Sequence, residues 1–327
     1  MQIPGFGKLT GNSGFIPLES CLDGHFCTGK DGVKQIFRTG DGKVELIAFD
    51  DRTVAYVKSS MGYPAYYPVR GVSASKRIQA VLMDLDGTTV HSEDFWISII
   101  EMCVRSLTKL PKFNFVDDDI PFVSGHSVSE HLHYCIQKYC PDASLESARD
   151  YYFEHTRREM QAILEGHGRT DAFTPAPGVK DFLLDIKAKG LKIGLVTSGL
   201  KEKAYPAIVS AFQSMGLGAP EDFYDCIITA GITLRGREPG TLGEIEAKPH
   251  PWLYAESVCV GLGIPADDAD SVIGIEDSGA GVCSVRLAGC YTAGIAGGNI
   301  IESGTLGFCN EYFNDFEQIS KRIAERC

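Results

Sequence analysis

The sequence predicts an α/β fold, in which a doubly wound, Rossmann-like parallel sheet carries an inserted α-helical domain and follows a small β module. Short apolar runs alternate with helical stretches in the second half of the chain, and one long helical stretch interrupts this alternation. The first 75 residues instead show strand-like alternation separated by turn residues. We therefore expect three parts, which are an N-terminal β-rich module (1–75), a core domain (76–90 and 175–327) and a helical domain (91–174).

The N-terminal module is predicted from three stretches of alternating apolar and polar residues, which are 35–37, 44–49 and 53–57. Gly40-Asp41-Gly42 and Asp50-Asp51 separate these stretches, and such residues favour hairpin turns. The stretch 61–68 contains two prolines, which favours a linker or packing arm over a helix. An added structural layer or a homodimer contact is the role we expect for the module.

The core domain is predicted from four apolar runs that are short enough for buried strands, namely 78–83, 191–196, 226–229 and 271–275. Helical stretches separate these runs, which is typical of a parallel sheet covered by helices on both faces. Binding sites in such sheets lie at the carboxyl ends of the strands.

The helical domain lies between the first and second runs, where about 90 residues show helical periodicity and no convincing strand. Ser127 and Glu130 form a capping box. The apolar residues that follow fall on one face of a helix, and they are Val128, Leu132, Cys135, Ile136 and Tyr139. We expect four or five helices in this insertion.

Polar signatures stand at the ends of the predicted strands or shortly after them. In chain order they are Asp84-Leu85-Asp86-Gly87-Thr88, Thr197-Ser198-Gly199, Lys248-Pro249-His250-Pro251 and Gly274-Ile275-Glu276-Asp277-Ser278-Gly279. Together and in this order, these first to fourth motifs closely resemble those of the haloacid dehalogenase (HAD) superfamily. The resemblance covers about residues 77–325.

The resemblance implies hydrolysis of a phosphate ester. Asp84 would be the nucleophile and would form an aspartyl phosphate. Asp86 would protonate the leaving group and then deprotonate the water that hydrolyses the intermediate. Lys248 would supply a fixed cation and Thr197 a hydroxyl donor. The expected substrate contacts in these motifs are Gly87, Ser198 and Gly199.

A magnesium site is also implied. Clustered carboxylates would repel an anionic substrate unless a hard cation lay among them, and oxygen ligands suit Mg²⁺. By resemblance, the ion would be held by Asp84, by the main-chain carbonyl of Asp86 and by Asp277. Glu276 would contact it directly or through water.

The helical insertion directly after the first motif resembles the C1 cap of β-phosphoglucomutase-like and phosphoglycolate phosphatase-like members. Residues 123–127 resemble the specificity loop of that cap, so Gly125 and His126 are candidate substrate contacts. The chain departs from the family pattern at His91, where aspartate is common. It also has no evident cationic cluster of the sugar phosphomutase type around Gly125, and residues 233–246 lengthen the loop before Lys248.

The expected function is a Mg²⁺-dependent phosphatase that acts on a small phosphorylated metabolite. A phosphomutase, which returns the phosphoryl group to a second hydroxyl, is one alternative. A non-catalytic regulatory or binding protein on a HAD scaffold, with residues 1–75 as its working surface, is another. Because all four motifs lie after residue 75, deletion of residues 1–72 is expected to leave a folded phosphatase.

Composition excludes several other classes. The net charge of −12, from 31 Lys and Arg against 43 Asp and Glu, disfavours a nucleic-acid partner. The 11 cysteines include no Cys-x-x-Cys pair, so structural zinc is not expected. The N-terminal residues lack the features of a signal peptide, and no apolar run approaches the roughly 18 residues of a membrane span. We therefore expect a cytoplasmic protein with no membrane partner.

Overall fold

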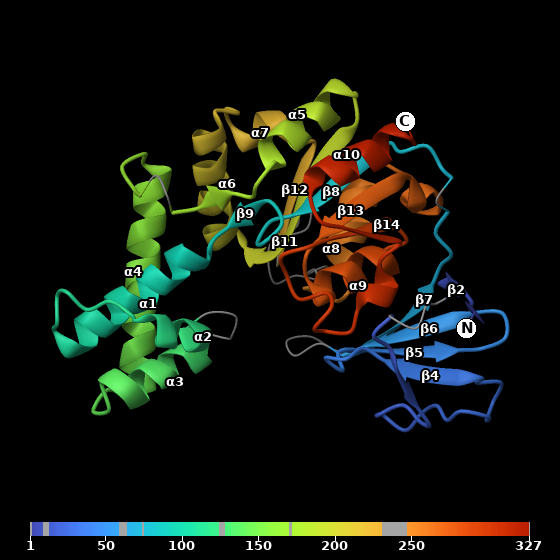
Figure 1. The fold of residues 1–327 in the computed structure, drawn as a ribbon, viewed down its shortest axis with the longest axis horizontal. Coiled ribbons are helices and arrows are strands. Elements are labelled where there is room, and N and C mark those ends of the chain that lie inside the picture. The colour runs from blue at the N-terminus through green and yellow to red at the C-terminus, as the bar shows by residue number, and fades with distance from the viewer. Residues whose placement is uncertain are drawn as a thin grey trace. The chain divides into compact units, whose positions relative to one another are not determined.

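The computed structural model describes residues 2–8, 13–58, 64–73, 75–123, 128–169, 172–230 and 247–326. Figure 1 shows the fold as a ribbon. The chain forms two compact units. The first unit comprises Met1–Thr89, Ala176–Ala204 and Gly218–Cys327, and the second comprises Val90–Pro175 and Tyr205–Leu217.

A six-stranded parallel sheet forms the centre of the first unit. From edge to edge, its strands are β12 (Cys226–Ala230), β11 (Lys192–Leu200), β8 (Ala80–Asp84), β13 (Val272–Glu276), β14 (Tyr291–Ile295) and β15 (Glu311–Phe313). The four strands that the sequence predicts are confirmed as β8, β11, β12 and β13. Because β8 lies between β11 and β13, the winding of the chain reverses there, and ligands bind at such switch points.

Helices cover both faces of this sheet (Figure 1). One face carries α5 (Val179–Ala188) and α10 (Phe316–Ala324), and the other carries α8 (Trp252–Glu256) and α9 (Gly279–Leu287). A short helix, α7 (Pro220–Phe223), precedes β12. All five residues of β8 are buried, because the central strand is covered on both faces, and this explains its continuous apolar run.

The N-terminal module contains a five-stranded antiparallel sheet. Its strands, in spatial order, are β3 (Ile16–Leu18), β4 (Gln35–Arg38), β5 (Val44–Ala48), β6 (Thr53–Val57) and β7 (Ala65–Val69), and a hairpin of β1 (Gln2–Ile3) and β2 (Gly7–Lys8) precedes it. The three predicted strands are confirmed as β4, β5 and β6. The linker predicted at 61–68 is wrong from Ala65 onward, because that segment is β7. Strand β7 lies at the edge of the sheet, where proline is tolerated, and Pro68 pairs there with Val54.

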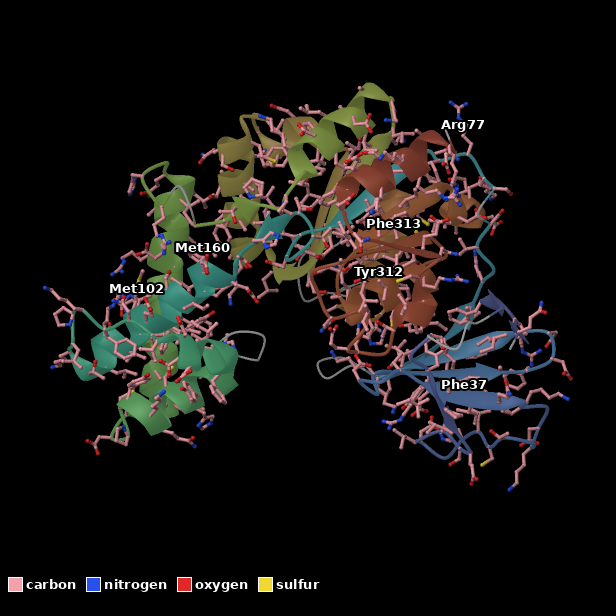
Figure 2. The ribbon with its side chains drawn as sticks, in the orientation of Figure 1. Phe37, Arg77, Met102, Met160, Tyr312 and Phe313 are labelled. Carbon is pink, nitrogen blue, oxygen red and sulfur yellow. The ribbon has the colours of Figure 1, made fainter. Side chains whose placement is uncertain are left out.

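One face of this antiparallel sheet shares a hydrophobic core with α9 and the loop that follows β14. The core includes Leu46 and Val57 from the module, and Val282 and Phe308 from the core domain. Phe37 also belongs to it, and the partly buried Tyr312 packs against it; Figure 2 labels both residues. The module therefore forms a third layer that packs on α9.

Arg286 of α9 contributes polar contacts to the same interface. Its guanidinium donates hydrogen bonds to the carbonyl oxygens of Arg70, at 2.8 Å, and of Gly5. Burial lowers the pKa of Arg286 to about 10. Carbonyl groups of the module thus satisfy a buried cation of the core domain.

The second unit contains the inserted helices. Its described part has four α-helices, as expected, and a 3₁₀ turn (Asp117–Asp119). The helices are α1 (Glu93–Thr108), α2 (Ile120–Val123), α3 (Val128–Tyr139) and α4 (Leu145–Leu164). Most of α6 (Lys201–Met215) also belongs to this unit, and β9 (Val90–His91) pairs with β10 (Thr174–Pro175). Leu132 and Cys135 are buried on the predicted face of α3, whereas Ser127 lies outside the described residues.

Asp119 organises the segment before α3. Its buried carboxylate accepts hydrogen bonds from Tyr134 at 2.5 Å, Lys138 at 2.6 Å and Tyr139 at 2.6 Å. Burial alone would raise the pKa of Asp119, but these hydrogen bonds outweigh it and hold the pKa well below its usual range.

Within the described ranges, no helix combines the length and the apolar character that crossing a membrane requires.

Candidate active site

Asp84, the last residue of β8, lies at the centre of the candidate site. The Lys248 ammonium donates a hydrogen bond to Asp84 Oδ1 and another to the carbonyl oxygen of Val196, at 3.2 Å. The same ammonium forms an ion pair with Glu276 Oε1 at 2.7 Å. The Lys248 side chain is only 6% exposed. Residues from the first, third and fourth motifs therefore meet at the carboxyl ends of adjacent strands.

The turn after Asp84 folds against the fourth motif. Gly87 adopts a φ of +85°, and a Cβ at this position would overlap the Asp277 carboxylate, so the turn requires glycine. Thr88 Oγ1 donates a hydrogen bond to Asp277 Oδ1 at 3.3 Å. Asp86 lies on the exposed part of this turn.

The second and third motifs are also connected. Thr197 is buried near the end of β11, and its hydroxyl oxygen accepts a hydrogen bond from the Gly199 N–H at 2.9 Å. The exposed Ser198 hydroxyl accepts one from the backbone N–H of Lys248 at 3.1 Å. The second bond connects the end of β11 to the backbone of Lys248, whose ammonium contacts Asp84.

The acidic residues form a cluster suited to a hard cation. One carboxylate oxygen from each of Asp84, Glu276 and Asp277 lies within 4.8 Å of the others, and all three residues are buried. Burial, together with the charge of Asp84, raises the pKa of Asp277 to about 7. The same two causes raise the pKa of Glu276, although the ion pair with Lys248 opposes them. Three carboxylates around one ammonium leave an excess of negative charge, which a divalent cation with oxygen ligands would neutralise.

Sequence reasoning missed two residues of the site, one that contacts this cluster and one that interacts with Asp86. The buried Tyr254 hydroxyl donates a hydrogen bond to Glu276 Oε1 at 2.5 Å. Lys203, at the start of α6, interacts electrostatically with Asp86, and burial lowers the pKa of this lysine while Asp86 opposes that shift. Neither residue stands in a motif, so only their positions in space reveal them.

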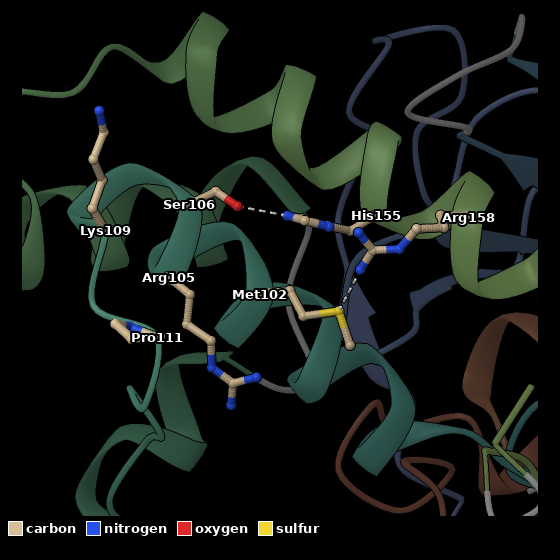
Figure 3. Close-up of a pocket in the computed structure, with 7 residues that line it drawn as sticks. All are labelled: Met102, Arg105, Ser106, Lys109, Pro111, His155 and Arg158. Carbon is tan, nitrogen blue, oxygen red and sulfur yellow. Dashed lines mark hydrogen bonds between the residues drawn. The ribbon is translucent and has the colours of Figure 1, made fainter.

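The expected cap contacts Gly125 and His126 lie outside the described residues, as does the lengthened loop 233–246. A cavity of about 550 Å³ lies elsewhere in the cap, between α1 and α4 (Figure 3). Its arginines are already paired, Arg105 with Glu101 and Arg158 with Glu159. The cavity contains no motif residue.

The doubly wound sheet and the acidic cluster at its switch point define an α/β enzyme scaffold with a site for charged ligands. Residues 78–289 match the family model for haloacid dehalogenase-like hydrolases, and the chain belongs to this family. The match begins just before β8 and ends just after α9. The N-terminal module therefore lies outside the part that defines the family.

Solved structures agree with this fold. A candidate β-phosphoglucomutase from Thermotoga maritima is 20% identical, with a TM-score of 0.54 over 76% of this chain and 100% of its own. A predicted phosphoglycolate phosphatase from Haemophilus somnus is 17% identical, with a TM-score of 0.52 over 77% of this chain and 99% of its own. These similarities confirm the HAD fold with a C1-type cap. Among curated proteins, none matches the chain.

Proposed function

We propose that this protein is a Mg²⁺-dependent phosphatase that hydrolyses a small phosphorylated metabolite through an aspartyl phosphate on Asp84. The observation that carries the proposal is a convergence of four residues at the carboxyl ends of β8 and β13. These residues are Asp84, Lys248, Glu276 and Asp277. A buried carboxylate held by an ammonium is a fixed nucleophile. The exposed Asp86, two residues further on, is available to a leaving group.

The reaction would take place in two steps. In the first, an oxygen of Asp84 attacks phosphorus, the P–O bond of the ester breaks, and Asp86 donates its proton to the departing oxygen. In the second, Asp86 takes a proton from water, which attacks the aspartyl phosphate. Inorganic phosphate leaves, and both aspartates return to their starting states.

The remaining residues hold and align the reactants. Lys248 orients Asp84 through the hydrogen bond to Oδ1, and Thr197 with its neighbouring N–H groups would bind the phosphoryl oxygens. A bound Mg²⁺, held by Asp84, Asp277 and the main-chain carbonyl of Asp86, with Glu276 nearby, would supply positive charge beside those oxygens.

The proposal is tested by measuring phosphate release from an aryl phosphate and then from a panel of phosphorylated metabolites. Activity should require Mg²⁺ and be lost with EDTA. Asp84→Asn should abolish turnover without altering the circular dichroism spectrum, because an amide cannot attack phosphorus. Asp185→Asn, on the surface of α5, is the matched control and should behave as wild type. Full turnover in metal-free buffer, or by Asp84→Asn, would refute the mechanism.

The two alternatives give different outcomes in the same assay. A phosphomutase would convert a phosphorylated sugar to its positional isomer and release little phosphate. A non-catalytic scaffold would bind inorganic phosphate without turning over any member of the panel. We favour the phosphatase because the sequence shows no cationic cluster of the sugar phosphomutase type around Gly125.

A further inference from the structure

Tyr67 of the N-terminal module contacts the third motif directly. Its hydroxyl shares a hydrogen bond of 2.7 Å with Nδ1 of His250, which stands two residues after Lys248. The indole N–H of Trp252 donates to the same hydroxyl at 3.1 Å. His250 is 1% exposed, so its ring is held in the interior beside the module.

The backbone of His250 is fixed as well. Its N–H donates to the carbonyl oxygen of Ala247 at 3.1 Å, which closes a turn around Lys248. Its carbonyl oxygen accepts a hydrogen bond from Ser284 of α9 at 2.5 Å. The turn that presents Lys248 is therefore anchored to α9 through the backbone of His250, and to the module through its ring.

The position of this turn matters because the Lys248 ammonium bridges Asp84 and Glu276. A shift of about 1 Å in a catalytic group can cost on the order of a hundredfold in rate. The side chain is long, but it is buried and makes hydrogen bonds on several sides, so movement of its backbone is transmitted to the ammonium.

The module also supports the fourth motif. The backbone N–H of Asp41 donates to the carbonyl oxygen of Ser303 at 3.0 Å, and the N–H of Ser303 donates to the carbonyl oxygen of Asn299 at 2.9 Å. The Asn299 side chain in turn accepts a hydrogen bond from the N–H of Gly279, at the start of α9, at 2.8 Å. Contacts from the module thus reach two of the four motifs.

We infer that Tyr67 is a positioning residue for Lys248 and acts through His250. The N-terminal module, which lies outside the family match, then helps to position a residue of the active site. The expected effect of Tyr67 on kcat rests on the proposed phosphatase activity. The expected effect of Tyr67 on the position of Lys248 does not.

The first experiment compares Tyr67→Phe with Tyr66→Phe. Tyr67→Phe removes the hydroxyl that bonds to His250, and kcat for an aryl phosphate should fall about five- to tenfold, as expected for one hydrogen bond. Tyr66 lies on the same strand and bonds instead to Asp23, so Tyr66→Phe is a matched control and should retain wild-type kinetics. Equal kinetics of the wild type and Tyr67→Phe would overturn the inference while leaving the phosphatase proposal intact.

A double-mutant cycle separates positioning from general stability. Binding of inorganic phosphate, measured by calorimetry, should weaken in Tyr67→Phe and in Lys248→Ala. Tyr67→Phe should have no further effect when Lys248 is already alanine, because its effect passes through that side chain. Equal weakening in both backgrounds would assign Tyr67 a merely structural role and overturn the inference.

A third measurement does not depend on turnover. In protein labelled with ¹³C-lysine, the Cε signal of Lys248 is identified by its loss in Lys248→Arg. The chemical shift of this signal should change in Tyr67→Phe and remain unchanged in Tyr66→Phe. An unmoved signal in Tyr67→Phe would overturn the inference even in a protein without phosphatase activity, whereas a wild type without activity would refute only the proposed function.

Discussion

Deletion of residues 1–72 should unfold the core domain, although the positions of the motifs alone lead to the opposite expectation. The module covers one side of α9 and of the loop after β14. In the intact protein, four large apolar side chains of the core domain lie in the core that they share with the module, and each is at most 7% exposed: Val282, Leu287, Ile300 and Phe308. Removal of the module would expose them to water.

The expected loss is comparable to the total stability of a domain. Burial of one such side chain contributes about 1.5–3 kcal/mol, so four contribute roughly 6–12 kcal/mol. This figure is an upper estimate, because a truncated chain can cover part of the surface again. Since native domains are stable by only about 5–15 kcal/mol, the truncated chain should be unfolded or aggregated.

The assay compares the full chain with residues 73–327 by circular dichroism and chemical denaturation. A milder test is Leu46→Ala, at a buried position of β5, which should cost about 2–5 kcal/mol. Ile16→Ala, at a position 39% exposed on β3, is the matched control and should cost much less. Fluorescence of Trp252 in a Trp96→Phe background reports on the core domain, because the chain has 2 tryptophans. A truncated chain that unfolds cooperatively at the wild-type midpoint would refute the reasoning.

Three further predictions concern titrating groups. Asp86→Asn should slow hydrolysis of alkyl phosphates far more than that of aryl phosphates, since an aryl oxide needs little protonation; equal losses would exclude Asp86 as the acid. Mg²⁺ should raise the melting temperature more at about pH 8 than at about pH 6, as measured by calorimetry, because it binds the ionised form of Asp277. Asp119→Asn should destabilise the cap by about 1–3 kcal/mol in denaturant titrations. In this variant, the free energy of unfolding of the cap should also decrease less steeply as the pH falls below about 4.

The signs of the two pH effects follow from the directions of the pKa shifts. The pKa of Asp277 is raised from near 4 to about 7, so its stabilising contribution without metal is present below about pH 4 and is lost as the pH rises to about 7. Metal binding offsets this loss at the higher pH. The pKa of Asp119 is lowered, so its contribution is present at neutral pH and is lost as the pH falls below about 4. An equal effect of Mg²⁺ at both pH values, or an unchanged acid profile in Asp119→Asn, would contradict these assignments.

The motif residues could be predicted from the sequence because their elements obey general rules. Asp84, Thr197 and Glu276 each lie at or near the carboxyl end of a buried parallel strand, and neighbouring parallel strands bring these ends together. Lys248 stands on a loop, so its position could be inferred only from the resemblance to the family. The structure places its ammonium between Asp84 and Glu276.

Other parts of the fold could not be predicted because their signals are weak or non-local. Strand β14 reads Tyr-Thr-Ala-Gly-Ile, which lacks the aliphatic run of the other strands. The small residue Gly294 is needed there, since a Cβ would lie 2.8 Å from the sulfur of Cys309. The contact between Tyr67 and His250 spans 183 residues, and nothing in either local sequence indicates it.

The electrostatics of the site suggest why a module outside the family match would stabilise it. The Lys248 ammonium contacts two of the three buried carboxylates, Asp84 and Glu276, and such a cluster keeps its geometry only while its donors are held in place. The contacts of the module include His250, which adjoins Lys248, and also α9 and the loop whose Asn299 contacts Gly279. A layer with these contacts would stabilise the residues that bind the phosphoryl group in the proposed reaction, whichever metabolite carries it. We therefore expect changes at its interface to lower kcat on all substrates alike, whereas changes that alter the preference among substrates should fall in the cap.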